Sequence, residues 1–136
     1  MRSRLIALAL CLVPLTTAAD DIGPPLSAEQ FDALTLGKTI TYSADGAVYG
    51  IEEYRPGRRV VWAFSEGNCQ EGDWFAMGDQ ICFDYHMPEV GLQCWTFHQR
   101  GDDLVAWFEG DRAGEPLVSL RESPAPLNCP GPEIGV

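Results

Sequence analysis

Between Lys38 and Glu122 the chain repeats one pattern, in which a short run of β-favouring residues is followed by a turn rich in glycine, aspartate, asparagine or proline. The pattern occurs eight times, at residues 38–43, 47–55, 59–65, 73–77, 80–85, 92–99, 104–109 and 117–122. Short runs at this spacing are typical of antiparallel sheets, and the segments between them are too short for the crossover helix that joins parallel strands. The sequence therefore predicts an all-β antiparallel meander that forms a small closed or partly closed barrel.

A short helix is predicted ahead of the first strand, in the stretch SAEQFDALTLG. Ser27 suits the N-cap position, and Gln30 follows at the spacing of a capping box. Leu26 and Phe31 are spaced as a hydrophobic staple, and Gly37 supplies a stop signal. Because a helix of about two turns is unstable by itself, we expect it to dock its apolar face on the barrel.

Residues 1–19 are typical of a secretory signal peptide. Arg2 and Arg4 precede an apolar stretch that is too short to span a bilayer, and small residues lead up to Ala19, the expected cleavage position. We therefore expect an exported protein, in the periplasm or outside the cell. The rest of the chain is predicted to comprise a flexible leader (20–26), a single β domain that includes the helix (27–122) and an irregular tail tethered by Cys129 (123–136).

The charge balance narrows the class of partner. The chain has 20 acidic and 9 basic residues and a formal net charge of −11, and loss of the signal peptide removes two of the basic residues. Such a protein repels nucleic acid and anionic lipid headgroups, so we expect neither nucleic-acid binding nor membrane insertion. An unknown protein or small molecule is the expected partner, and a cationic one suits the charge. The oligomeric state is left open.

Four cysteines remain after the expected cleavage, because Cys11 lies in the signal peptide. An even number in a small exported domain indicates disulfides, here two. If the QICFDY and LQCWTFH runs form a hairpin with Cys82 opposite Cys94, one register gives both a disulfide and an apolar face. That face would consist of Ile81, Phe83, Trp95 and Phe97. Cys69 is then left to pair with Cys129.

A metal site is the alternative use of these cysteines, with His86 and His98 as further ligands. Their C-x3-H spacing differs from that of recognised zinc sites, and an oxidising compartment competes for the thiols. We therefore predict neither a metal nor another cofactor.

The sequence offers no catalytic constellation. It lacks the Gly-x-Ser-x-Gly elbow of serine hydrolases, and with the thiols paired no nucleophile–base pair is predicted. Glu52 and Glu53 are the best polar candidates, because neighbours on a strand point to opposite faces and one of them must face the apolar side or lie near a rim. Which of the two faces inward is left open. Alternatively, they are charges on an edge strand that discourage aggregation.

Aromatic residues alternate along several of the predicted strands and would fill the core of a small β domain. Some runs are apolar on both faces, for example VVWAF and LVAWF, so the helix, the tail or a partner must cover the second face. A candidate binding surface, at an apolar patch or at the barrel mouth, is predicted from the tryptophans and the two glutamates. It comprises Trp62, Trp74, Trp95, Trp107, Glu52 and Glu53.

Short motifs follow one another from the start of the first predicted strand to the sixth. They are Gly37-Lys38-Thr39, Asp45-Gly46, Gly72-x-Trp74, Ile81-Cys82-Phe83 and Cys94-Trp95-x-Phe97. This series, over about residues 36–108, resembles a family of small exported bacterial proteins of unknown function. The resemblance implies a β-rich exported domain in which Cys82 and Cys94 form a pair, and it implies no established activity. Cys69, Cys129 and the YGIEEY run depart from the family pattern.

These observations favour a non-catalytic binding or accessory module of the cell envelope. One alternative is an inhibitor of a basic envelope hydrolase such as a lysozyme, which the negative charge would attract. A small hydrolase that uses Glu52 or Glu53 is a further alternative, and it requires two carboxylates that converge on a cleft.

Overall fold

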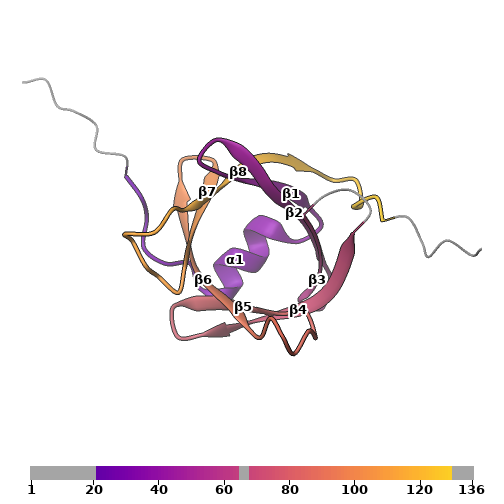
Figure 1. Ribbon diagram of the computed structural model, residues 1–136. Helices are drawn as coiled ribbons and strands as arrows, with labels where there is room; N and C mark the ends of the chain where they lie inside the picture. Colours follow the sequence, from indigo (N-terminus) through magenta and orange to yellow (C-terminus); the bar gives the residue numbers. More distant parts are fainter. Residues whose placement is uncertain (1–20, 65–67, 130–136) are drawn as a thin grey trace, which may run out of the picture.

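A computed structural model describes residues 21–64 and 68–129 of the chain, so the predicted signal peptide lies outside the described residues. Eight strands pair in sequence order, each pair is antiparallel, and β8 pairs with β1 (Figure 1). The predicted all-β barrel is confirmed, and it is closed. The strands are β1 (Thr39–Ala44), β2 (Ala47–Arg55), β3 (Arg59–Ala63), β4 (Cys69–Met77), β5 (Gln80–Asp84), β6 (Gln93–Arg100), β7 (Asp103–Phe108) and β8 (Leu117–Ser123).

The largest difference from the predicted strands is at β4, which begins at Cys69 rather than at Asp73. In the sequence, the run EGNCQEG resembles a loop because it is polar and rich in glycine. In the structure, Cys69 pairs with Ala63 and Gly72 pairs with Val60, so the ladder to β3 continues through this segment. Pairing with a neighbouring strand outweighs the weak local preference.

Helix α1 (Ala28–Thr35) begins at the predicted N-cap and has the predicted capping box. The amide of Gln30 donates to Oγ of Ser27 at 3.2 Å, and the amide of Ser27 donates to Oε1 of Gln30 at 2.9 Å. The chain leaves the helix through Gly37, whose φ of 77° lies in the left-handed region that glycine adopts most easily. Seen down the barrel axis, α1 lies within the ring of strands (Figure 1).

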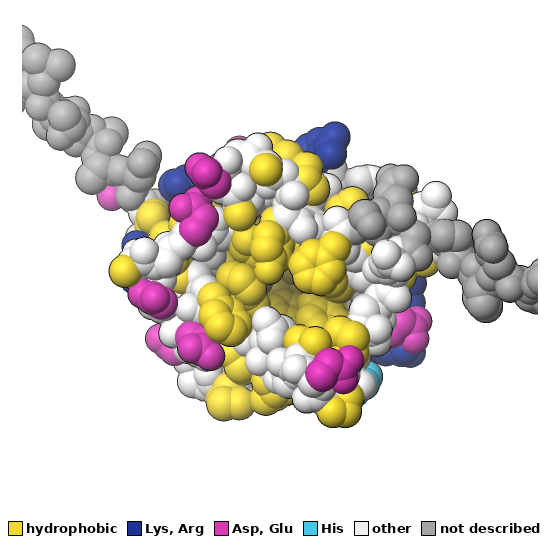
Figure 2. Space-filling model, in the orientation of Figure 1, with side chains coloured by type: hydrophobic (Ala, Val, Ile, Leu, Met, Phe, Trp, Pro, Cys, Tyr) yellow, Lys and Arg dark blue, Asp and Glu magenta, His cyan; other side chains and the backbone are white. Residues whose placement is uncertain are grey.

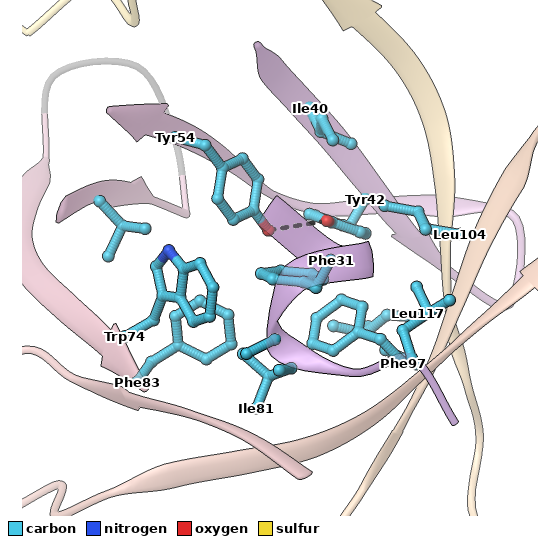
Figure 3. Close-up of a cluster of buried hydrophobic side chains, with 14 of the residues drawn as sticks. Phe31, Ile40, Tyr42, Tyr54, Trp74, Ile81, Phe83, Phe97, Leu104 and Leu117 are labelled. Atoms are coloured by element: carbon cyan, nitrogen blue, oxygen red, sulfur yellow. Dashed lines mark hydrogen bonds between the residues drawn. The ribbon is translucent and has the colours of Figure 1, made fainter. Parts of the chain in front are cut away.

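Phe31 anchors α1 in one end of the barrel, and it is fully buried. Its ring centroid lies 4.6 Å from that of Phe97, 5.1 Å from that of Trp74 and 5.5 Å from that of Tyr54. These rings surround Phe31 where it enters from the helix (Figure 3). The helix and the barrel therefore share one hydrophobic core, and α1 closes this end.

Two segments cover the outer face of β6 and β7. On the N-terminal side, the Gly23 amide donates to the carbonyl of Gln99 at 3.0 Å, and Nδ1 of His98 donates to the carbonyl of Gly23 at 2.8 Å. Part of the segment predicted as a flexible leader is thus hydrogen-bonded to β6. In the β7–β8 loop, the guanidinium group of Arg112 lies over the ring of Trp107, 3.8 Å from its centroid. The chain itself covers this face.

The C-terminal tail covers the outer face of β2 and β3. Leu127 packs in a small cluster with Val61, and its amide donates a 2.9 Å hydrogen bond to Glu53. The predicted disulfide between Cys69 and Cys129 holds the tail to the start of β4. A second part of the outer apolar surface is thus covered within the chain.

The other predicted disulfide joins Cys82 and Cys94 across β5 and β6. The predicted register is confirmed, because Cys82 lies opposite Cys94 and Ile81 lies opposite Trp95. Ile81 and Phe83 belong to the core inside the barrel, so the cysteine pair lies on the outer side. Two disulfides are compatible with an oxidising compartment.

Candidate functional site

The half of the barrel away from α1 contains a cavity of about 150 Å³. Figure 2 looks at this end of the molecule and shows a hollow surrounded by hydrophobic side chains. Of the 14 described residues that line the cavity, nine are aromatic, one is acidic and none is basic. The aromatic residues are Tyr42, Tyr49, Tyr54, Trp62, Phe64, Phe83, Tyr85, Trp95 and Phe97.

Glu52 is the acidic residue of the cavity wall. Alternation along β2 turns it inward together with Gly50 and Tyr54, while Glu53 points outward. Glu52 is only 1% exposed, and the hydroxyl group of Tyr85 donates to its two carboxylate oxygens, at 3.0 and 3.1 Å. Burial raises the pKa of Glu52 well above its ordinary value, and the hydrogen bond from Tyr85 opposes this shift only in part. The empty cavity therefore favours the neutral carboxylic acid.

A second polar pair lies deeper in the barrel. The hydroxyl oxygens of Tyr42 and Tyr54 are 2.8 Å apart, as the dashed line in Figure 3 shows. Burial raises the pKa of both tyrosines, so both stay neutral at physiological pH. The ring of Tyr54 contacts Phe31 and also lines the cavity. The tyrosine pair therefore separates the cavity from the end that α1 closes.

Two inward-facing glycines make room for two rings of the cavity wall. A Cβ atom at Gly50 of β2 would overlap the indole ring of Trp62. A Cβ atom at Gly72 of β4 would lie 2.8 Å from the ring of Tyr85 and 2.5 Å from the carbonyl oxygen of Asp84. Because the two glycines carry no side chain, the ring of Trp62 can lie across β2 and the ring of Tyr85 can lie across β4. The hydroxyl group of Tyr85 thereby reaches Glu52.

The cavity opens through an apolar rim. The rings of Tyr49, Trp62 and Phe64 lie side by side there, with centroids 5.4 to 5.9 Å apart. Phe64 is 66% exposed, and Val90 in the β5–β6 loop is 43% exposed. Clusters of exposed apolar side chains often mark binding sites.

The structure brings together only part of the predicted binding surface. Trp62, Trp95 and Glu52 line the cavity. Trp74 is buried in the closed end of the barrel, beside the helix. Trp107 lies on the outer face beneath an arginine of the β7–β8 loop. The four tryptophans therefore have three different surroundings.

Glu53 lies outside the barrel and anchors the tail. Its carboxylate accepts hydrogen bonds from Arg55 at 2.8 Å and from the amide of Leu127 at 2.9 Å. Partial burial would raise the pKa of Glu53, but the hydrogen bonds from Arg55 and Leu127 outweigh it and lower the pKa. In the closed barrel β2 has a neighbour on each side. The alternative interpretation of Glu52 and Glu53 as edge-strand charges is therefore wrong.

The two histidines lie apart from the cavity. His86 is exposed, with Nε2 3.0 Å from the carboxylate of Asp73, and His98 is buried on the outer face of β6. Within residues 21–64 and 68–129, no group of three or more His, Cys, Asp and Glu side chains is placed to hold a metal ion. In the same described part, no helix is long and apolar enough to cross a membrane.

Sequence reasoning missed the tyrosines of the wall and the glycines beneath the rings. A usable signal was present, since Tyr54 stands two residues after Glu52 and Tyr85 two residues after Phe83. Alternation along the strands places both tyrosines on the same face as these inward residues.

No known family model, no curated protein and no solved structure matches the chain. The resemblance to small exported bacterial proteins therefore stays a prediction. What the site can do has to be inferred from its own geometry.

Proposed function

We propose that the chain is a non-catalytic binding module of the cell envelope, which takes a small and largely apolar ligand into the open half of its barrel. The observation that carries this proposal is the cavity of about 150 Å³, whose aromatic wall is interrupted by the Glu52–Tyr85 pair. Sites for small molecules are usually concave, already formed before binding, and lined by apolar side chains with a few polar groups that orient the ligand.

The volume limits the size of the enclosed part of the ligand. An apolar cavity of about 150 Å³ in another protein holds benzene, so the enclosed part should be about as large as one six-membered ring. Larger ligands would extend through the mouth, where Phe64 and Val90 offer exposed apolar contacts. The interior of an eight-stranded barrel is in general just wide enough to be filled by side chains or to hold one small ligand.

Export is part of the proposal. The predicted signal peptide supports it, and the disulfides Cys69–Cys129 and Cys82–Cys94 fit an oxidising, exported compartment. The hydrolase alternative finds less support, because among the described residues that line the cavity Glu52 is the one carboxylate. A reaction that needs two converging carboxylates finds no second one among these described residues.

Titration of the purified, oxidised protein with N-phenyl-1-naphthylamine, a neutral dye that fluoresces in apolar surroundings, tests the proposal. We expect saturable binding to one site. Leu117→Trp should weaken binding about tenfold or more, because Leu117 lines the cavity and a larger ring would fill it. Leu120→Trp on the same strand is the matched control, since Leu120 is 51% exposed on the outer surface. Equal binding by both variants, or no binding by the wild type, would refute the proposal.

A further inference from the structure

Among the described residues that line it, the cavity combines many aromatic rings with a single acidic group and no basic one. We infer that the ligand carries an alkylated ammonium group, which binds between the aromatic rings of the wall and the carboxyl group of Glu52. This inference rests on the proposed function and adds the chemical class of the ligand.

The aromatic rings supply the first part of the argument. The face of an aromatic ring is electrostatically negative, and cages of such rings bind alkylated ammonium groups. Here the rings surround the cavity from several strands, with Trp62 from β3, Trp95 from β6 and Tyr42 from β1. The rings of Phe83 and Tyr85 lie nearly parallel, with an interplanar angle of 7°, and both belong to the lining. A cation in the cavity would therefore meet ring surfaces on more than one side.

Glu52 supplies the second part. A carboxylate has about four sites that accept hydrogen bonds, and here its two oxygens share the one hydroxyl proton of Tyr85. The neighbouring arginine, Arg55, is turned to the outer face and is bound to Glu53 at 2.8 Å. The buried carboxyl group thus has no cationic partner among the described residues that line the cavity. A ligand cation would supply that partner.

The chemistry of the wall also selects among charged groups. A primary ammonium is strongly hydrated and has three hydrogen-bond donors that need acceptors in the site. The hydroxyl groups of Tyr42 and Tyr54 are already hydrogen-bonded to each other. An alkylated ammonium presents apolar methyl groups and needs no hydrogen-bond acceptors. An anion would meet both the acidic group of the wall and the net charge of −11. The alkylated ammonium is therefore the charged group that fits best.

Binding of such a cation should release a proton. Tyr85 faces Glu52 directly, and Tyr42 and Tyr54 are the other titratable groups close to it. Burial raises the pKa values of all four groups, so the empty site favours the neutral acid of Glu52 and the tyrosines stay neutral in the complex. A bound cation favours the carboxylate form of Glu52, and the affinity should therefore rise with pH.

Three related probes test the inference by calorimetric titration of the oxidised protein. Choline carries the alkylated ammonium, 3,3-dimethylbutan-1-ol is its neutral isostere, and ethanolamine is its primary-amine counterpart. We expect choline to bind about tenfold or more tighter than the neutral alcohol, and also tighter than ethanolamine. If the protein also binds phosphatidylcholine vesicles and choline displaces it from them, the source of the cation is a lipid headgroup. Binding of free choline without vesicle binding would identify a soluble one.

Two neighbouring glutamates provide matched variants. Glu52→Gln should greatly reduce the preference for choline over the neutral alcohol, because only the aromatic rings then favour the cation. Glu53→Gln should keep the preference because Glu53 lies outside the barrel. Equal affinities for choline and the alcohol, or an unchanged preference in Glu52→Gln, would overturn the inference and leave the proposed function standing. A wild-type protein that binds N-phenyl-1-naphthylamine but not choline would do the same. Failure to bind the dye as well would refute the proposed function itself.

Discussion

The hydroxyl group of Tyr85 bridges the two carboxylate oxygens of Glu52 inside the barrel, at 3.0 and 3.1 Å. The two residues are 33 positions apart in the sequence, and they meet because β2 and the end of β5 face one another across the barrel interior. This contact holds the one acidic group among the described lining residues at a defined place in a largely aromatic wall. The strength of this hydrogen bond depends on the protonation state of Glu52, so substitutions and changes of pH can test the pair.

Glu52→Gln should change how stability depends on pH. Burial raises the pKa of Glu52 above its ordinary value of 4.5, so the folded protein holds a proton that the unfolded chain releases. The contribution of this group is fully present below pH 4.5 and is lost as the pH rises through the folded pKa. Glutamine keeps the shape and an acceptor for Tyr85. We therefore expect the variant to be more stable than the wild type at pH 8, with a flatter profile in urea unfolding between pH 5 and pH 9.

Glu53→Gln is the control and should act in the opposite sense. Burial would raise the pKa of Glu53, but its bonds to Arg55 and Leu127 prevail and lower it. Its contribution is present above the ordinary pKa and is lost as the pH falls through the folded value, so the variant should lose stability at neutral pH. A loss of stability at pH 8 in Glu52→Gln as well would contradict the raised pKa of Glu52.

Tyr85→Phe should destabilise the protein by about 1–3 kcal/mol, because it leaves the buried carboxyl group of Glu52 without its donor. In a Glu52→Met background the Tyr85 hydroxyl has itself lost its acceptor, so the same substitution should be neutral or stabilising. A double-mutant cycle of unfolding free energies measures this coupling. Equal losses in the two backgrounds would show that the hydroxyl acts through other contacts.

Gly72→Ala should cost more stability than Gly50→Ala. The new methyl group at position 72 would press on the carbonyl oxygen of Asp84, which belongs to the backbone of β5 and cannot turn away. At position 50 it would press on Trp62, a half-buried side chain that can move toward the mouth. Overpacking of this kind costs about 1–3 kcal/mol, and we expect the upper part of that range for Gly72→Ala. Thermal unfolding compares the two variants, and a shifted tryptophan emission should accompany only Gly50→Ala.

Removal of either disulfide should lower the free energy of unfolding, and only removal of Cys69–Cys129 should also release the C-terminal tail. In the chain-entropy model, the 12-residue separation of Cys82 and Cys94 is worth about 3 kcal/mol and the 60-residue separation of Cys69 and Cys129 about 4 kcal/mol. Replacing Cys69 and Cys129 by alanine should also free the tail, so that limited proteolysis removes Leu127 while the barrel stays folded. Replacing the other pair should leave the tail protected. Equal protection of the tail in both double variants would contradict this prediction, because it would show that the Leu127 contacts hold the tail without the disulfide.

The parts of the fold that depend on local pattern could be predicted. The eight strands could be predicted from the alternation of apolar residues and the spacing of turns. The capping box of α1 could be predicted from the spacing of Ser27 and Gln30. The register of β5 and β6 could be derived because one requirement, Cys82 opposite Cys94, also placed the apolar residues on a single face. Local pattern and a covalent constraint agreed in this hairpin.

The site could not be predicted in the same way, because it depends on which strands meet across the barrel. A tryptophan on a strand looks the same in the sequence whether its ring lines the cavity, as in Trp62, or packs against the helix, as in Trp74. From the sequence alone, Gly72 is predicted to lie in a loop. In the structure it belongs to β4, and the ring of Tyr85 packs over it. Long-range pairing supplies this information, and a single sequence does not contain it in readable form.

Helix α1 makes the barrel a cup rather than a tube. With Phe31 and the tyrosine pair beneath the cavity, a ligand of the proposed kind would enter and leave through the same opening, so its uptake and release would share one barrier. Transfer of such a ligand to an acceptor would require the open end of the barrel to face that acceptor. The exposed ring of Phe64 would then be among the first groups to contact it.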